Sequence, residues 1–335
     1  MIAPAFTRTS DWWEPKITLL LSIGLMVCYL YPQDISWTIL GFLLVLLLVV
    51  SASAVYVSLI NDYTDLEEDL QAGKTNRLQN FSVRQRKLLI LGSVGIIALF
   101  IYLLRDFSMG IGFFIAAQLS YTCYSFPPIR LKARGIYGVM ADTFGAHVFP
   151  AIGMFVFLAE YLSQSVDWMA VLLLGGWSFI YGLRGILSHQ YLDRDHDERV
   201  GVNTFACQFP VEKISNIEWP LLTAEVFLFI GMLLYFHLYA LVAVLGIYWL
   251  YAWSIRRYTA HTFVLILHPG DQPNWNILMA GYYQFLLPVS LLGILGISHP
   301  WLLLGFPFFV ILFPNELMKN MSMIKTLLPF KAIKI

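Results

Sequence analysis

Long apolar stretches recur along the whole chain, and their length limits the fold more than any other feature. Ten of them lie near residues 17–32, 36–60, 87–104, 108–126, 140–160, 167–190, 217–236, 238–254, 275–297 and 299–314. A helix needs about 17 to 25 residues to cross the hydrocarbon core of a bilayer. In lipid the backbone must satisfy its own hydrogen bonds, so long apolar runs without short strand alternation indicate helices and not a barrel. The sequence therefore predicts an all-α, polytopic transmembrane bundle of nine or ten helices.

Composition agrees with a membrane protein and excludes some function classes. Hydrophobic residues make up 59% of the 335 residues and charged residues 13%, whereas soluble domains carry about 25% charged residues. The 21 Lys and Arg balance the 21 Asp and Glu, so a global attraction to nucleic acid has no support. Cys28, Cys123 and Cys207 lack the spacing of a metal or redox site, and we interpret them as packing residues.

Basic residues gather in the loops on one face of the predicted bundle. They follow the second, fourth, sixth and eighth apolar stretches, whereas the opposite loops carry Arg105 alone. Because basic loops stay on the cytoplasmic side, we predict that this face is cytoplasmic. The lysines of the tail, residues 315–335, join this face only if the number of spans is even. Trp12 and Trp13 precede the first stretch and no small-residue cleavage site follows it, so we expect an anchor and not a signal peptide.

An acidic cluster follows the second apolar stretch. Asp62, Asp65 and Asp69 are offset by 0, 3 and 7 residues, so on an α-helix their carboxylates lie within about 60° of one another and form one stripe. Stacked like charges repel unless a cation compensates them. Mg²⁺ suits this role, because it takes one or two carboxylates and completes its shell with water and phosphate oxygens. Lys74 and Arg77 follow closely and are expected to hold the outer oxygens of such a phosphate.

A second acidic cluster follows the sixth stretch with the same spacing. Adding 128 to the residue number maps Asp62 to Gln190, Asp65 to Asp193 and Asp69 to Asp197. We therefore predict two pseudo-repeated four-helix halves, near 17–130 and 140–260, and extra helices near 275–314, within one domain that spans residues 1–335. One charge run is most simply a solvated loop, but two runs in register favour a shared role. The candidate metal ligands are Asn61, Asp62, Asp65, Asp69, Gln190, Asp193 and Asp197.

These motifs resemble those of the UbiA superfamily of intramembrane prenyltransferases. The segment from Asn61 to Asp69, with Lys74 and Arg77, is similar to the first aspartate-rich motif of the family, and Asp193 to Asp197, with Gly201 and Thr204, to the second. The segment from Tyr124 to Gly135 resembles a loop of the branches that prenylate quinone and chlorophyll precursors. Three features depart from the family pattern: Gln190 replaces an acidic residue, Leu78 replaces a proline, and the loop lacks the Tyr-x-x-x-Lys spacing of the ubiquinone and menaquinone branches.

The resemblance implies a central cavity, open laterally to lipid, that binds an isoprenyl diphosphate through Mg²⁺. Ionisation of the allylic C–O bond would give a carbocation, which a lipophilic acceptor of aromatic or quinone type attacks. Catalytic roles then fall to Asp62, Asp65, Asp69, Asp193 and Asp197, and diphosphate contacts to Lys74, Arg77, Arg130, Lys132 and Arg184. The rings of Tyr121, Tyr124, Tyr181 or Tyr191 could stabilise the cation, although ordinary packing explains any one of them.

Several alternatives remain open at the level of sequence. Arg184, in the sixth stretch, either reaches the diphosphate or pairs with Asp142 or Glu225, and Asp142 is a candidate acceptor base. An enzyme of the same scaffold that cyclises the prenyl chain, or transfers it to a sugar or lipid, would carry the same residues. A cation-coupled transporter would also use paired acids, but these are expected at the bilayer midplane and not at helix ends.

Overall fold

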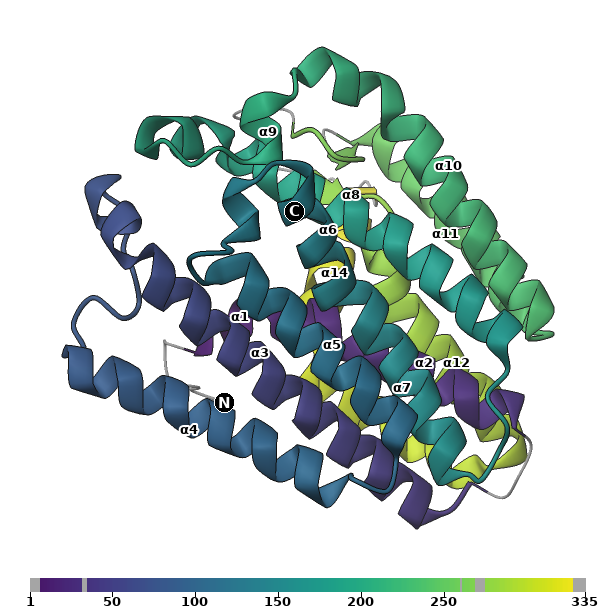
Figure 1. Ribbon diagram of the computed structural model, residues 1–335. Helices are drawn as coiled ribbons and strands as arrows, with labels where there is room; N and C mark the ends of the chain where they lie inside the picture. Colours follow the sequence, from purple (N-terminus) through teal and green to yellow (C-terminus); the bar gives the residue numbers. More distant parts are fainter. Residues whose placement is uncertain (1–6, 32–34, 260, 269–274, 328–335) are drawn as a thin grey trace, which may run out of the picture.

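The computed structural model describes residues 7–31, 35–259, 261–268 and 275–327, and these are mainly helical (Figure 1). The helices are α1 (Thr9–Trp12), α2 (Thr18–Leu30), α3 (Trp37–Gln71), α4 (Val83–Leu103), α5 (Ser108–Ser125), α6 (Ile136–Thr143), α7 (Phe149–Tyr161), α8 (Trp168–Val200), α9 (Phe205–Gln208), α10 (Val211–Tyr235), α11 (Tyr239–Tyr258), α12 (Leu287–Ser298), α13 (Gly305–Leu312) and α14 (Pro314–Leu327). Two short strands, β1 (Thr262–Val264) and β2 (Trp275–Ile277), pair in parallel.

The ten apolar stretches are mainly helical, which confirms the predicted all-α membrane architecture. Within the described residues, seven helical segments are long and apolar enough to cross a membrane, and an eighth results if Pro300–Leu312 and Leu317–Lys325, which meet at 78°, form one bent span. α5 and the shorter helix Tyr282–Ser298 lie outside this count. The ninth stretch differs from expectation, because its first residues form β2. The pseudo-repeat stays a prediction, and the tail from residue 328 lies outside the described residues.

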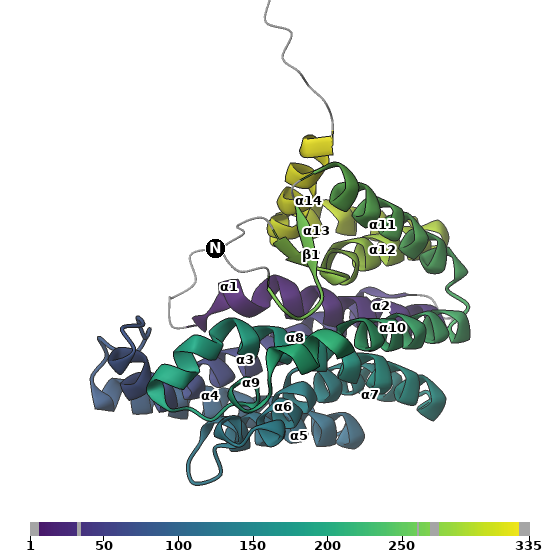
Figure 2. The same ribbon diagram turned by 90° about the horizontal axis from the view of Figure 1, so that it is seen from above.

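Helix α2 lies at the centre of the bundle. Figure 2 shows α1 and α2 between a group that contains α3 to α8 and a second group that contains α11 to α14, and α2 contacts α3, α7 and α12. Ten of the 13 residues of α2 are buried, as expected for a helix that is apolar all round. Helix α4, at the edge of the bundle, buries only Ser93 and Ile97 within the protein, so its remaining apolar surface suits contact with lipid.

Helices α3 and α8 are longer than a bilayer requires. They have 35 and 33 residues, which corresponds to roughly 50 Å at 1.5 Å per residue and exceeds the hydrocarbon core of about 30 Å. Each begins at a side-chain cap, formed by Ser36 in α3 and by Asp167 in α8. Helix α8 ends at Gly201, whose φ of 72° favours glycine. The final turns of both helices carry the acidic clusters. They are therefore expected to extend beyond the hydrocarbon core of the membrane.

Within the described residues, three π-helical segments interrupt the bundle, at Trp13–Ile17, Phe144–Val148 and Tyr282–Leu286. Each contains or closely precedes a proline, namely Pro15, Pro150 or Pro288. Proline has no N–H, and its ring clashes with the carbonyl group four residues earlier. For Pro150 and Pro288 that carbonyl belongs to Ala146 and Gln284, inside the π-helical segments. The wider π-helical turn relieves the clash between the proline ring and this carbonyl group. Such segments are frequent at functional sites.

Candidate functional site

A polar pocket of about 210 Å³ lies between the final turns of α3 and α8. Both acidic clusters line it: Asn61, Asp62, Asp65 and Asp69 come from α3, and Gln190, Asp193 and Asp197 come from α8. The structure thus brings together all seven residues that the sequence nominated as metal ligands. We call this space the acidic pocket. The metal-binding role of these residues stays a prediction.

Basic side chains contact the carboxylates of the acidic pocket. Lys74 Nζ lies 3.5 Å from Asp193 Oδ1 and so links the loop after α3 to α8. Lys132 contacts Asp65, and Arg130 lies 3.5 Å from the same carboxylate. Burial lowers the pKa of the Lys132 ammonium to about 8, while the negative charge of Asp197 opposes the shift. Three of the five cations predicted to hold a diphosphate therefore reach the acidic clusters directly.

The N-terminal segment supplies a further cation, which the sequence did not reveal. Arg8 lines the acidic pocket, with Nη1 3.3 Å from Asp62 Oδ1 and Nε 3.0 Å from Asp11 Oδ2. The fourth predicted cation, Arg77, lies 3.4 Å from Asp11. Arg8 has a φ of 51°, which is uncommon for a residue other than glycine. No spacing rule connects Arg8 to Asp62, because they are 54 residues apart and on separate elements.

Two neutral side chains hold the ends of the acidic stripes. Asn76 Nδ2 donates to Asp69 Oδ2 and to the carbonyl group of Asp62, both at 2.8 Å, and Asn76 Oδ1 accepts from the Leu78 N–H at 2.9 Å. Proline at position 78 could not donate this bond. Thr204 Oγ1 donates to Asp197 Oδ2 at 3.2 Å. Asn76 therefore fixes the loop that carries Lys74 and Arg77 against α3.

The donor set of the acidic pocket fits magnesium. Asp62 Oδ2 and both polar side-chain atoms of Gln190 are buried and lack a hydrogen-bond partner among the described residues. An unpaired buried polar group costs about 1–3 kcal/mol, so these atoms suit a site that a ligand completes. No three His, Cys, Asp or Glu side chains in the described parts of the chain converge closely enough to hold one ion. Mg²⁺ tolerates this, since it uses one or two carboxylates together with water and phosphate oxygens.

Arg184 lies away from the acidic pocket. Its Nε and Nη2 atoms lie 2.6 and 3.2 Å from the carboxylate oxygens of Glu225, and its other bonds go to the carbonyl groups of Leu265 and Leu278 at 2.8 and 2.9 Å. Tyr283 also donates to Glu225, at 3.0 Å. Because these partners enclose the guanidinium, which is 1% exposed, the structure favours the pairing with Glu225 over the predicted diphosphate contact.

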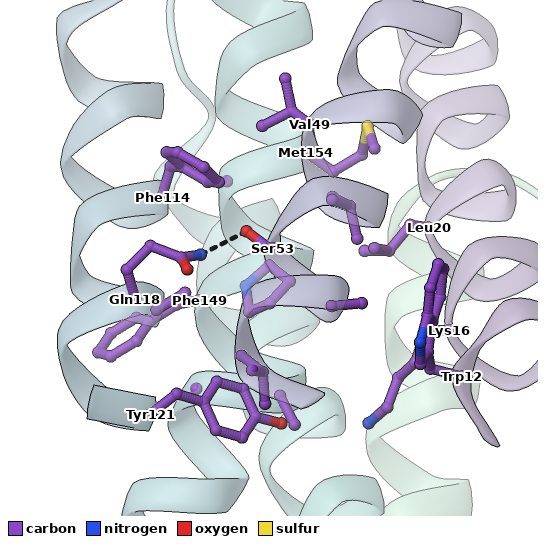
Figure 3. A pocket seen from close by; sticks show the side chains of 18 of the residues that line it. Trp12, Lys16, Leu20, Val49, Ser53, Phe114, Gln118, Tyr121, Phe149 and Met154 are labelled. Atoms are coloured by element: carbon purple, nitrogen blue, oxygen red, sulfur yellow. Dashed lines mark hydrogen bonds between the residues drawn. The ribbon is translucent and has the colours of Figure 1, made fainter. Parts of the chain in front are cut away.

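A second space, an apolar cavity of about 140 Å³, is shown in Figure 3. Its lining lies close to that of the acidic pocket. Three elements line both spaces. The N-terminal segment contributes Trp12 to the cavity and Arg8 to the pocket, α3 contributes Ser58 and Asp62, and α5 contributes Tyr121 and Tyr124. Each pair is three or four residues apart, which is about 4.5–6 Å along a helix. The apolar cavity therefore lies about one helical turn from the acidic pocket.

Comparison with known proteins identifies the fold. No curated protein matches the sequence. A structure of a UbiA homologue from Archaeoglobus fulgidus bound to GPP and Mg²⁺ has a TM-score of 0.57 at 14% identity, and the alignment covers 93% of this chain and 96% of that chain. A structure bound to DMAPP and Mg²⁺ has a TM-score of 0.59 at 14% identity, with 88% and 100% covered. Both likenesses establish a shared fold.

The sequence also matches a profile that is described as the UbiA prenyltransferase family. The match spans residues 18–266 and contains both acidic clusters. This agrees with the resemblance of the motifs and with the multiple apolar helices of an integral membrane protein. Because the matched segment is well over half of the 335 residues, this chain belongs to the UbiA prenyltransferase family.

Proposed function

We propose that this protein transfers an isoprenyl group from a prenyl diphosphate to a lipophilic acceptor, aromatic or quinone-type, in a Mg²⁺-dependent reaction. One observation carries the proposal: both acidic clusters line one pocket, and an apolar cavity lies one helical turn away. A diphosphate with Mg²⁺ suits the first space, and apolar reactants suit the second. Family membership supports this reaction, as do the related structures bound to GPP or DMAPP with Mg²⁺.

The roles of the residues follow from charge. The carboxylates of the two clusters, with the amide oxygens of Asn61 and Gln190, would hold magnesium. When bound, Mg²⁺ stabilises the negative charge that grows on the leaving diphosphate. Lys74 and Lys132 now contact Asp193 and Asp65. When Mg²⁺ neutralises these carboxylates, the two ammonium groups would be free to contact diphosphate oxygens. Arg77 and Arg130 would add planar guanidinium groups beside them.

The apolar cavity suits a carbocation because its walls exclude water. Tyr121 and Tyr124 lie at the junction with the acidic pocket, with ring centroids 6.4 Å apart in an edge arrangement, and their faces could stabilise the cation. The other two tyrosines considered have packing roles. Tyr181 stacks with Trp177, and the hydroxyl of Tyr191 donates to the Phe209 carbonyl.

We also propose that the acidic pocket faces the cytoplasm. The reason is the concentration of basic residues in the loops at this end of the bundle.

Cysteine labelling tests this orientation. A cysteine introduced at Lys132 is unsuitable for mapping this side, because Lys132 is a proposed ligand. Cysteines at exposed Arg199 and at Arg105, on the opposite side, are better reporters in whole cells. An impermeant thiol reagent should label Arg105→Cys and spare Arg199→Cys, and the reverse would contradict this orientation.

The reaction is tested with purified full-length protein in detergent. Labelled GPP and Mg²⁺ are incubated with a panel of lipophilic acceptors, and products are identified by mass spectrometry. We expect a prenylated acceptor, and none after EDTA treatment. A cyclic hydrocarbon formed without acceptor would instead show a cyclase. Metal flux into proteoliposomes that diphosphate does not affect would favour a transporter.

A further inference from the structure

A further cavity, of about 850 Å³, lies between the first half of α10, the end of α11 and the segment that contains β1. Helices α10 and α11 contact each other and run side by side (Figure 1). We call this space the α10–α11 cavity. It shares no lining residue with the acidic pocket or the apolar cavity, so the proposed function leaves it without a role. Its volume is typical of a ligand site, for which about 300–1,000 Å³ is usual.

One wall of the α10–α11 cavity is a stripe of α11 that ends in a positive charge. Trp249, Trp253 and Arg256 line the cavity, and offsets of 0, 4 and 7 residues place them on one face of the helix. Arg256 belongs to the last turn, and Trp249 lies about 10 Å further toward the middle of the helix. Because α11 is long and apolar enough to cross a membrane, this wall leads from the headgroup level into the bilayer. Tryptophan is enriched at that boundary.

The charged end of the α10–α11 cavity has unfilled hydrogen-bonding capacity. Arg256 forms no hydrogen bond or ion pair with any described residue. His261 also lines the cavity, and its buried Nε2 atom has no hydrogen-bond partner in the described parts of the chain. Burial, and then the positive charge of Lys319, lower the pKa of His261, so at neutral pH its ring is uncharged and one ring nitrogen donates. A phosphate oxygen is a suitable acceptor for both side chains.

Glu218 does not neutralise this end of the cavity. It is the one carboxylate among the described residues that line the space, and its Oε1 atom accepts from the N–H groups of Ile266 and Leu267 at 2.9 and 2.7 Å. The backbone therefore compensates this charge, and Arg256 stays available to an anion. Mg²⁺ with a diphosphate is a poor fit, because the metal uses one or two free carboxylates. The charges of this cavity match a single phosphate group.

We propose that the α10–α11 cavity binds an anionic phospholipid, whose phosphate contacts Arg256 and His261. An acyl chain would follow the tryptophans of α11 toward the middle of the membrane. Guanidinium binds phosphate through two parallel hydrogen bonds, and basic pockets between transmembrane helices bind lipid headgroups. Trp219 and Trp253 are 53% and 59% exposed, so their rings are accessible to a lipid chain. The inference goes beyond the proposed function and uses no residue of the acidic pocket.

The first test compares two headgroups on the same acyl chains. Full-length protein in detergent is titrated with dioleoylphosphatidylglycerol or dioleoylphosphatidylcholine, and bound lipid is counted by native mass spectrometry. Phosphatidylcholine has the same phosphate, but its choline adds a positive charge that repels Arg256. We therefore expect phosphatidylglycerol to bind about tenfold more tightly. Equal affinities would overturn the proposal, and this comparison on the unaltered protein needs no variant.

Competition identifies the source of the phosphate. Inorganic phosphate and glycerol 3-phosphate lack an acyl chain and cannot use the tryptophan wall. Either compound, in large excess, should displace little phosphatidylglycerol. Full displacement by one of them would show a site for a soluble phosphate and overturn the assignment to lipid. Displacement by GPP at an equal concentration, in the absence of Mg²⁺, would show a second site for a prenyl diphosphate and would also overturn it.

Two adjacent arginines provide a matched pair of variants. Arg256→Gln removes the charge at the cavity, so the affinity for phosphatidylglycerol should fall about tenfold, to that for phosphatidylcholine. Arg257 is exposed and does not line the cavity, so Arg257→Gln should change the affinity less than about twofold. Arg256→Lys keeps the charge without the planar fork and should retain part of the preference. Equal losses in Arg256→Gln and Arg257→Gln would show general attraction to a basic surface and contradict the site.

Two tryptophans of nearly equal exposure test the apolar wall. Trp253→Ala should weaken binding of both lipids about threefold or more, because acyl-chain contact is lost whatever the headgroup. Trp168, at the start of α8, is 60% exposed and lies outside the cavity, so Trp168→Ala is the control. A cooperative thermal transition without added lipid shows that each variant is folded. Unchanged affinities in Trp253→Ala would place the acyl chain elsewhere and overturn the proposed binding mode.

Discussion

The acidic clusters of α3 and α8 share one spacing and differ in their surroundings. In α3 the side chains of Asp62 and Asp65 are 6% and 17% exposed, and partners from three other segments contact the cluster. In α8 the side chain of Asp193 is 36% exposed, and its contacts to Lys74 and His189 are 3.5 and 3.7 Å long. The first cluster is held in place by protein, whereas the second is more open to solvent.

This difference arises outside the repeated residues. Arg8 comes from the N-terminal segment, and Arg130 and Lys132 come from the loop between α5 and α6. None of them has a counterpart at the second cluster among the described residues. The two clusters therefore share the spacing of their carboxylates, but the side chains that surround these carboxylates differ. We expect the stronger metal site at the first cluster, because its ligands are already oriented.

The largest effect is expected at Asp65. Asp65→Asn keeps the shape of the side chain and removes the charge that Lys132 and Arg130 contact. We expect kcat with GPP and acceptor to fall about 10³-fold, comparable to the loss of a major electrostatic group in an active site. Asp195→Asn is the control, because Asp195 is exposed and does not line the acidic pocket. Turnover within twofold of the unaltered protein would remove Asp65 from the site.

A smaller loss is expected at the matching position of the second cluster. Asp193→Asn should lower kcat about 10²-fold, because this carboxylate is more exposed and its charge is screened by water. The ratio of the two effects, measured in one assay at saturating GPP, tests the asymmetry directly. If Asp193→Asn costs as much as Asp65→Asn, or more, the first cluster is not the dominant metal site.

Substitution of the neutral side chain beside the first cluster should also reduce activity more than substitution of the one beside the second cluster. Asn76→Ala removes three hydrogen bonds and should lower kcat/KM for GPP about 30-fold, since the loop with Lys74 loses its anchor. Thr204→Val removes one bond to Asp197 and should lower it about threefold. Thermal melting of both variants shows whether the loss is confined to the site. Equal effects would mean that the two clusters depend on their neighbours to the same degree.

The smallest expected change is a gain at the second cluster. Gln190→Glu places a third carboxylate where the first cluster has Asp62 and should lower the Mg²⁺ concentration for half-maximal activity about threefold. The reason is that a carboxylate attracts the cation more strongly than an amide does. Gln164→Glu, at an exposed residue that lines neither the acidic pocket nor the apolar cavity, is a control. A higher Mg²⁺ requirement in Gln190→Glu would show that the amide is the better ligand here.

Sequence reasoning identified the residues of the acidic pocket because helical periodicity is local. Offsets of 0, 3 and 7 place side chains on one face wherever the helix packs. Contacts between distant segments leave no such pattern. Arg8 approaches Asp62, and Lys16 approaches His147, only through the fold. Arg184 had two candidate partners in the sequence, and only packing against α10 selected Glu225. Strand β2 was missed because its pairing with β1 is invisible to hydropathy.

The hydrogen bond between Leu78 and Asn76 has an evolutionary consequence. The family resemblance implied proline at the position of Leu78, yet in this chain the Leu78 N–H fills the Asn76 Oδ1 acceptor. A single exchange to proline would leave that buried oxygen unpaired while Asn76 still holds Asp69. Positions 76 and 78 are therefore coupled, because the residue at 78 must keep its N–H for as long as Asn76 stands two positions before it.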